Sequence, residues 1–272
     1  MVFKAYAKIN LALEVMDLKD GYHMVNNLMV LTNLYDEITL EKCEEIKIID
    51  NNIPDNIMIK AANLFLSHFN INSGVLISIK KNIPVAAGLA GGSTDAACVL
   101  TGLNELYNVG ATKEELMLLA SKLGSDVPYF ISGGLSLCTN RGEIVNKIDI
   151  KFNKIRLALI KINEGLSTAL VYKNYNYDGI SKTHKIDNII DALNKNDISK
   201  LKENIFNDLT SPALSLNNNL LDLYNRLNKI TKIYLSGSGP TLFGLDLSDE
   251  EVKEIRKELD KSTFFFDGYI EA

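Results

Sequence analysis

Residues 84–95 read PVAAGLAGGSTD and place three glycines within five positions, directly before a segment with helical spacing of apolar side chains. Glycine lets the backbone turn tightly and brings N–H groups close to a ligand. The N-terminus of the following helix would add free N–H donors and a partial positive charge. A capped turn between a strand and a helix would explain one glycine, whereas this density favours an anion site. The segment has neither the GKS or GKT ending of a P-loop nor the spacing of a dinucleotide fingerprint.

The residues after the glycines predict an amphipathic helix that begins at about Ser93. We expect Ser93 to cap this helix and Asp95, in its first turn, to interact favourably with the helix dipole. The hydroxyl groups of Ser93 and Thr94 can also reach a phosphate or a magnesium ion. The apolar positions of the helix are Ala96, Val99, Leu100, Leu103 and Leu106.

Before this loop, the pattern predicts two strands that pair as a hairpin. Residues 3–15 alternate between apolar and mostly polar side chains, so the first strand is expected to have one core face, with Lys8 and Asn10 on the other. Asp20-Gly21 predicts a turn, and the second strand is expected at about 28–41. A helix near 56–69 and a strand at 75–81 are expected to follow.

The rest of the chain predicts strands with helices between them and a β-α-β ending. Thr112 with Glu115, and Ser248 with Glu251, form capping-box patterns, so a helix is expected after each pair. Helices are expected within 167–228, and strands near 134–139, 143–148, 155–162, 232–235, 241–246 and 263–270. This order indicates an α+β fold with two lobes, which we divide into residues 1–160 and 161–272.

The composition restricts the partners of the chain. Its 272 residues carry a net charge of −5 without a cluster of lysine and arginine, which argues against nucleic-acid binding. No apolar run is long enough to cross a bilayer and the N-terminus shows no secretion signal, so no membrane association is expected. Cys43, Cys98 and Cys138 are isolated, which argues against a disulfide framework and fits a cytoplasmic location. Both a monomer and a homodimer are compatible with the sequence.

The 84–95 loop resembles the phosphate-binding motif of the GHMP kinases, and two further segments match that family in the expected order. Residues 7–11 read AKINL and residues 235–241 read LSGSGPT. Three ordered motifs that span most of the chain are more specific than any one of them. The resemblance implies a two-lobed α+β fold with the active site in the cleft between the lobes. It also implies phosphoryl transfer from ATP, with Mg²⁺ on the phosphates, to an alcohol of a small molecule.

Lys8 and Asp126 are the catalytic pair that the resemblance implies. Asp126 would accept the proton of the attacking hydroxyl, while Lys8 would keep Asp126 ionised and stabilise the hydroxyl oxygen. Without the resemblance, Lys8 is interpreted as an exposed strand lysine and Asp126 as a loop or cap residue. No protein side chain is assigned as a metal ligand.

The resemblance also implies which residues bind the two substrates. The glycine-rich loop would bind the ATP phosphates, and two further residues would border the adenine. The residues expected to bind ATP are Pro84, Val85, Ala86, Ala87, Gly88, Leu89, Ala90, Gly91, Gly92, Ser93 and Thr94 in the loop, with Asn56 and Lys81 at the adenine. The residues expected to bind the second substrate are Asn10, Tyr22, His23, Tyr172, Ser238 and Gly239.

Within the family, the resemblance is to the branch whose substrate carries a cytidine diphosphate moiety. The matching segments are DGYH at 20–23, DN at 55–56 and LGSDVPYF at 123–130. Tyr22 and Tyr172 would stack on the base, and a ring nitrogen of His23 would bind its polar edge. Ala90 and Ser125 depart from the more usual glycine and alanine, but both are small.

Two alternatives remain open. A sister kinase or decarboxylase that acts on mevalonate derivatives, homoserine or a sugar would have no base to stack on Tyr22. A binding or regulatory protein that kept the fold but lost catalysis would not require both Lys8 and Asp126. The segment from Ser236 to Gly239 is expected to form a second backbone cradle, with a plain hairpin turn as the competing interpretation.

Overall fold

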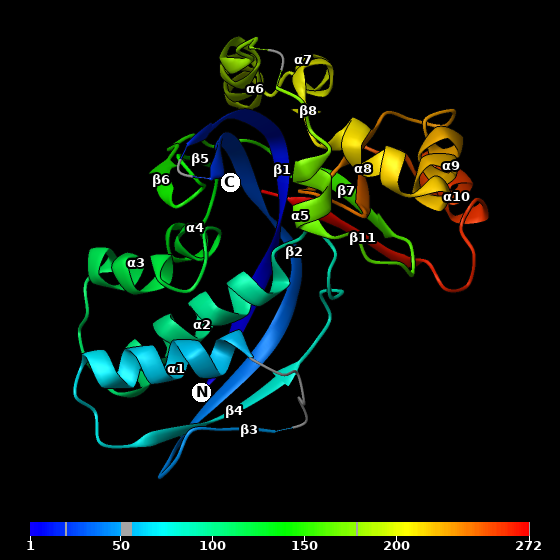
Figure 1. The fold of residues 1–272 in the computed structure, drawn as a ribbon. Coiled ribbons are helices and arrows are strands. Elements are labelled where there is room, and N and C mark those ends of the chain that lie inside the picture. Colours follow the sequence, from blue (N-terminus) through cyan, green and yellow to red (C-terminus); the bar gives the residue numbers. More distant parts are fainter. Residues whose placement is uncertain (20, 50–55, 178, 272) are drawn as a thin grey trace.

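The computed structural model describes residues 1–19, 21–49, 56–177 and 179–271, and Figure 1 shows the arrangement of their helices and strands. Asp20 of the expected turn and Asp55 of the Asp55-Asn56 pair lie outside the described residues. Within them, no helix is long and apolar enough to span a lipid bilayer.

Strands and helices follow one another along the whole chain. The strands are β1 (Val2–Lys19), β2 (Tyr22–Cys43), β3 (Lys47–Ile49), β4 (Gly74–Lys80), β5 (Ser136–Thr139), β6 (Ile144–Lys147), β7 (Ile155–Lys161), β8 (Phe206–Asn207), β9 (Ile233–Leu235), β10 (Thr241–Leu245) and β11 (Phe264–Ile270). The helices are α1 (Ile57–His68), α2 (Gly91–Leu106), α3 (Lys113–Ser121), α4 (Val127–Ser132), α5 (Thr168–Lys173), α6 (Thr183–Lys195), α7 (Ile198–Asn204), α8 (Thr210–Leu216), α9 (Asn218–Leu227) and α10 (Asp249–Lys257).

The predicted hairpin of β1 and β2 is confirmed, and it is the longest feature of the fold (Figure 1). The two strands run antiparallel over nearly their full length, although β2 begins at residue 22 rather than at about 28. Register shifts lie on both sides of the stretch from Lys8 to Asn10. Such irregularities bend a strand and redirect its side chains, so the hairpin is distorted where the AKINL motif lies.

The strands form two groups, and within the described residues one residue pair joins them. In the first group, β2 pairs with β1, β4 and β5. In the second, β7 pairs with β10 and β11, and β10 pairs with β9. The groups are joined between β11 and β2 at Ile270 and Thr32. Because β7 belongs to the second group, a lobe boundary just before residue 155 would keep that group intact, and the division at residue 160 stays a prediction.

Each group of strands has its own helical cover. Helices α1, α2 and α3 pack on β2 and β4 through a core that includes Phe65, Leu103 and Ile77. Helices α8, α9 and α10 pack on β7, β9 and β10 through a second core that includes Leu223 and Ile255. Figure 1 shows these two layers on separate sides of the long hairpin, so a site built across the hairpin receives residues from both halves of the chain.

Two local expectations are wrong and two are confirmed. Both capping boxes form, at Thr112 and at Ser248. Helix α2, however, begins at Gly91 instead of Ser93, and its N-cap residue is Ala90, which has a left-handed backbone and no capping side chain. Asp95 is therefore the fifth residue of the helix and lies outside the first turn, where it is buried.

The expectation of one core face on β1 is also wrong. Lys8, Asn10 and Glu14 are as fully buried as the apolar residues that alternate with them. Their cover comes from the C-terminal half of the chain, because β8 pairs with β1 and Gly237 donates a hydrogen bond to Asn10. Buried polar groups require hydrogen-bond partners, so this second face of β1 is where a functional site is to be sought.

Candidate active site

Lys8 and Asn10 are neighbours on the buried polar face of β1. The Lys8 ammonium donates to Asn10 Oδ1 at 2.7 Å, and Asn10 Nδ2 donates to Asn27 Oδ1 on β2 at 2.5 Å. Asn10 Oδ1 also accepts from the backbone N–H of Gly237 at 2.7 Å. Asn10 thus joins the lysine, the second strand of the hairpin and the C-terminal glycine loop in one network.

The two glycine-containing loops touch each other through their backbones. A Cβ atom on Gly88 would lie 2.3 Å from the carbonyl oxygen of Ser236, and one on Gly237 would lie 2.9 Å from the carbonyl oxygen of Gly88. Ser236 Oγ donates to Gly88 O at 3.1 Å, and Thr241 N donates to Ala87 O at 3.3 Å. The C-terminal loop is a turn between β9 and β10, and it also braces the glycine-rich loop.

Asp126 is close enough to Lys8 to affect its protonation. Burial lowers the pKa of Lys8, and the negative charge of Asp126 counteracts this effect. Asp126 lies in the turn directly before α4 and is partly exposed, while Lys8 is buried. A partly exposed carboxylate whose charge acts on a buried ammonium could receive a proton from a substrate hydroxyl placed between them while the cation stabilises the oxygen. Lys8 pairs with Asn10 rather than with Asp126, so the catalytic pairing of Lys8 and Asp126 stays a prediction.

The N-terminus of α2 offers backbone donors toward the glycine-rich loop. Thr94 N is the first N–H of this helix to donate to a backbone carbonyl, that of Ala90. The N–H groups of Gly91, Gly92 and Ser93 thus have no partner within the helix. The loop before it reverses direction through left-handed residues at Ala86, Gly88 and Ala90. A loop followed by free helix donors is the arrangement that binds phosphate groups.

Lys81 is held between two carboxylates at the beginning of this loop. Its ammonium donates to Asp36 Oδ2 and to Asp95 Oδ2, both at 2.6 Å. Asp36 Oδ1 accepts from the backbone N–H groups of Asn82 and Ile83 at 2.6 and 2.8 Å. Asp95 Oδ1, in contrast, is buried and has no hydrogen-bond partner. Burial raises the pKa of Asp95 to about 7, with Lys81 opposing the shift and Asp36 adding to it.

This cluster predicts a pH dependence of stability. A carboxyl group whose folded pKa is near 7 rather than 3.8 binds its proton more tightly in the folded state, so its contribution to stability is present at low pH and lost as the pH rises through 7. An Asp95→Asn variant cannot titrate there. Between about pH 5 and about pH 8, wild-type Tm should fall relative to that of the variant by roughly 4 °C or more. Thermal unfolding followed at both pH values measures this difference, and parallel changes in the two proteins would contradict it.

The predicted base-binding residues gather at the turn end of the hairpin. The His23 and Tyr172 ring centroids are 5.8 Å apart, although β2 and α5 are distant in sequence. His23 Nδ1 lies 2.9 Å from the carbonyl oxygen of Met16, which can only accept, so Nδ1 carries the proton and Nε2 is left as an acceptor. The Tyr22 side chain is 58% exposed, with the guanidinium of Arg141 over its ring at 5.1 Å.

The remaining predicted residues border these groups. Asn56 caps α1, with Oδ1 accepting from Met58 N at 2.9 Å. Ser238 Oγ lies 2.8 Å from Thr168 Oγ1, so the C-terminal loop contacts the first residue of the helix that carries Tyr172. Gly239 lies against Leu166, which belongs to the segment before that helix.

Several residues of the site escape prediction from the sequence. Asp36 and Asn27 lie within β2, where alternating polar residues are expected on any half-exposed strand. Arg141 belongs to the turn between β5 and β6 and has no motif around it. Only the burial of Asp36 and Asn27 distinguishes them, and burial depends on contacts made after the chain folds.

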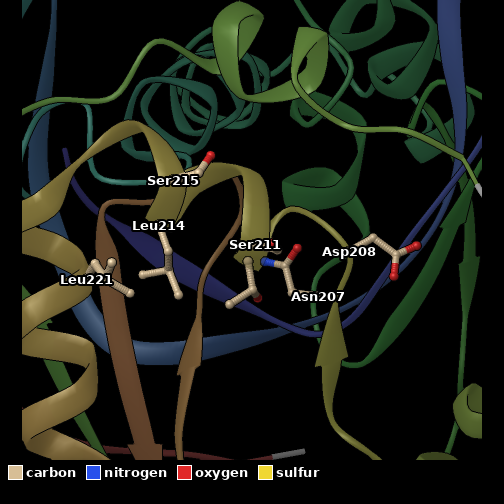
Figure 2. A pocket seen from close by; sticks show the side chains of 7 residues that line it. Asn207, Asp208, Ser211, Leu214, Ser215 and Leu221 are labelled. Carbon is tan, nitrogen blue, oxygen red and sulfur yellow. The ribbon is translucent and has the colours of Figure 1, made fainter.

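A pocket of about 500 Å³ lies next to this site, beside α8. Figure 2 shows Asn207 and Asp208 on the segment that leads from β8 into α8, with Leu214 and Leu221 also on its wall. Its lining contains neither Lys8 nor Asp126, so it is distinct from the site of the predicted catalytic pair.

Comparison with known proteins agrees with the geometry. Residues 56–134 match the family model of the GHMP kinases N terminal domain, and residues 189–264 match that of the GHMP kinases C terminal. A 4-diphosphocytidyl-2-C-methyl-D-erythritol kinase of Clostridium perfringens is 43% identical over 253 residues, which cover 89% of this chain and 88% of that protein. One of Acetivibrio thermocellus is 41% identical, with the same coverage.

Solved structures show the same likeness. A crystal structure of 4-(cytidine 5'-diphospho)-2C-methyl-D-erythritol kinase matches with a TM-score of 0.86 at 28% identity, over 100% of both chains. The homoserine kinase of Cytophaga hutchinsonii matches with a TM-score of 0.71 at 18% identity, over 98% of this chain and 95% of that one, which is a likeness of fold.

Proposed function

This chain belongs to the GHMP kinase family, and from that membership we propose that it phosphorylates 4-diphosphocytidyl-2-C-methyl-D-erythritol. As a small-molecule kinase it uses ATP. The proposed acceptor is the 2-hydroxyl of the methylerythritol unit, and the products are the 2-phosphate and ADP. This reaction belongs to the non-mevalonate route to isoprenoid precursors.

Asp126 and Lys8 supply the chemistry at the hydroxyl. Asp126 takes the proton as the hydroxyl oxygen attacks, and Lys8 stabilises the charge that develops on that oxygen. Lys8 is kept in place by its hydrogen bond to Asn10, which Gly237 and Asn27 orient in turn. The support for this step is a buried ammonium whose pKa responds to the carboxylate of Asp126.

The glycine-rich loop and the start of α2 bind the triphosphate. The N–H groups of Gly91, Gly92 and Ser93 face no carbonyl within their helix, which fits an anionic ligand. Asn56 and Lys81, at the start of α1 and the end of β4, border the adenine. These roles rest on the loop geometry and on the family resemblance together.

Mg²⁺ fits the same site. The described residues contain no group of three or more His, Cys, Asp or Glu side chains that could hold a metal ion. Mg²⁺ commonly binds through substrate phosphates with few protein ligands, so the hydroxyl of Ser93 at the start of α2 suffices as a protein contact. When bound, the ion would neutralise charge on the phosphates.

The cytidine end of the substrate is the part that selects this reaction within the family. Cytosine presents an amino group that donates hydrogen bonds, and His23 Nε2 is the acceptor left by the bond from Nδ1 to Met16 O. Tyr22 precedes His23 on β2 and Tyr172 packs against the His23 ring, so the two tyrosines provide aromatic faces for the base. The His23–Tyr172 contact is the single observation that carries this assignment.

A coupled assay of ADP release tests the proposal. The purified protein is supplied with ATP, Mg²⁺ and 4-diphosphocytidyl-2-C-methyl-D-erythritol, and in parallel with mevalonate, phosphomevalonate, homoserine or galactose. Turnover confined to the cytidyl substrate is expected. Turnover with one of the others would retain Lys8 and Asp126 as the catalytic pair but remove the base-binding role of Tyr22 and His23. No turnover by protein that binds ATP would favour a regulatory function.

A further inference from the structure

Three residues, 206–208, connect the two ends of the substrate site. Phe206 and Asn207 form β8, which runs parallel to β1 opposite Ala12 and Leu13. Asp208 N donates to the carbonyl oxygen of Leu13 at 2.9 Å and extends this contact. The segment therefore lies directly against the strand that carries Lys8 and Asn10 (Figures 1 and 2).

Asn207 fixes the C-terminal glycine loop. Its Nδ2 donates to Leu235 O at 2.9 Å and to Gly237 O at 2.8 Å, and its Oδ1 accepts from Leu209 N at 2.9 Å. The side-chain amide of Asn207 thus donates both of its hydrogen bonds to the C-terminal loop, while its oxygen accepts one from the backbone two residues further along the chain. Gly237 is the residue whose N–H donates to Asn10, so Asn207 reaches Lys8 through two intermediate residues.

Asp208 supports the opposite, base-binding end. Its Oδ2 accepts from Val15 N at 3.0 Å and from Tyr175 Oη at 3.2 Å, and its Oδ1 accepts from Lys182 Nζ at 2.8 Å. The ring of Tyr175 packs edge-on against His23, with centroids 6.1 Å apart and planes at 74°. Val15 is also the residue before Met16, whose carbonyl holds His23 Nδ1. Asp208 therefore fixes His23 from two directions.

We propose that Asn207 and Asp208 are positioning residues for the two ends of the substrate, with Asn207 acting on the phosphoryl-transfer end and Asp208 acting on the base end. Neither side chain needs to touch the substrate, because each acts through a residue that does. This division of roles rests on the proposed function. It follows that the two adjacent residues affect different kinetic constants.

The kinetic test compares variants at both positions with the cytidyl substrate and ATP. Asn207→Ala frees the loop that orients Asn10 and Lys8, so kcat should fall about 10- to 100-fold, the effect of a displacement near 1 Å at the reacting groups. Asp208→Asn and Tyr175→Phe loosen His23, so KM for the cytidyl substrate should rise about 3- to 10-fold, the loss of roughly one hydrogen bond. KM for ATP should change less than about twofold in these two variants.

Asn228→Ala is the matched control for Asn207. Asn228 also uses its amide to bridge backbone groups, donating to Tyr224 O at 2.9 Å and accepting from Ile233 N at 3.1 Å, but it lies at the other end of β9. The kinetic constants of the Asn228→Ala variant should match those of the wild type. If Asn207→Ala and Asn228→Ala lower thermal stability equally and neither changes kcat, Asn207 is merely structural and the proposal fails.

Nitrogen-15 NMR of the His23 ring provides a readout that needs no substrate. The Nδ1 and Nε2 shifts report the tautomer and its hydrogen bond to Met16, and they should change in Asp208→Asn and Tyr175→Phe but remain as in the wild type in Asn207→Ala. Unchanged shifts in all three variants would remove the role of Asp208. Failure of the wild type to turn over the cytidyl substrate would instead contradict the proposed function. The NMR shifts would still decide whether Asp208 positions His23.

Discussion

Replacement of Asp126 by asparagine is expected to lower kcat about 10²- to 10⁴-fold, the range that a positioned general base contributes. Asparagine keeps the size and polarity of the side chain but cannot accept the proton of the attacking hydroxyl. It also removes the negative charge that counteracts the effect of burial on the pKa of Lys8. The substituted residue lies in the turn before α4 and belongs to neither the glycine-rich loop nor α2, so nucleotide binding should be retained.

Steady-state kinetics and nucleotide titration separate these two effects. kcat is measured with saturating ATP and cytidyl substrate, and the affinity for ADP is measured by calorimetry on the same preparation. Asp149→Asn, a change of the same kind at an exposed position after β6, serves as the control and should leave both quantities unchanged. Near-normal turnover by Asp126→Asn would remove Asp126 as the base, and a parallel loss of ADP affinity would indicate a general disturbance of the site.

The elements that the sequence predicts well are those whose pattern is local. The alternation in β1, the helical spacing in α2 and the two capping boxes each depend on residues that are near one another in the chain, and all four elements form. The short elements β3, β8 and α4 were not predicted, because two to six residues contain too little periodicity to be detected.

The start of α2 shows where local reasoning fails. Ser93 is a good capping residue, but the chain enters the helix through Ala90 in a left-handed conformation, and Gly91 and Gly92 form its first positions. Asp95 lies in the interior, where it accepts a hydrogen bond from Lys81, a residue that precedes the loop. A capping preference of about 1 kcal/mol is small compared with the packing of the two glycine loops, so tertiary contacts decide where the helix begins.

The catalytic pair shows a second limit of prediction from the sequence. The sequence pattern alone makes Lys8 an exposed strand lysine, and only the family resemblance selects it. Lys8 is in fact buried, and Asn10, its hydrogen-bond partner, is held by Gly237, about 230 positions later in the chain. Positioning residues such as Asp208 and Tyr175 escape both kinds of reasoning, because they act through a neighbour and carry no motif of their own.

The contact between the two glycine loops leads to the second large expected effect. In a Gly88→Ala variant, the new methyl group would lie 2.3 Å from the carbonyl oxygen of Ser236, and residue 88 would have to keep a φ of +74°. The clash with the backbone oxygen cannot be relieved without moving one loop away from the other, and the left-handed conformation costs alanine a further amount of about 1–2 kcal/mol. We expect a loss of more than about 3 kcal/mol in the free energy of unfolding, or roughly 6–12 °C in Tm.

Gly92→Ala is the matched control for this substitution, and the comparison is made on unfolding. A Cβ on Gly92 would meet only Ile57 Cγ2, at an ordinary contact distance of 3.7 Å, and this glycine is already in a helix. Its Tm should therefore remain within about 3 °C of the wild-type value or rise slightly, since alanine favours helix more than glycine does. Equal unfolding temperatures for Gly88→Ala and Gly92→Ala would mean that the loops can separate without cost. In that case Asn10 and Lys8 would have to be oriented by β2 alone, through Asn27, and the C-terminal loop would no longer be needed to explain the geometry of the catalytic pair.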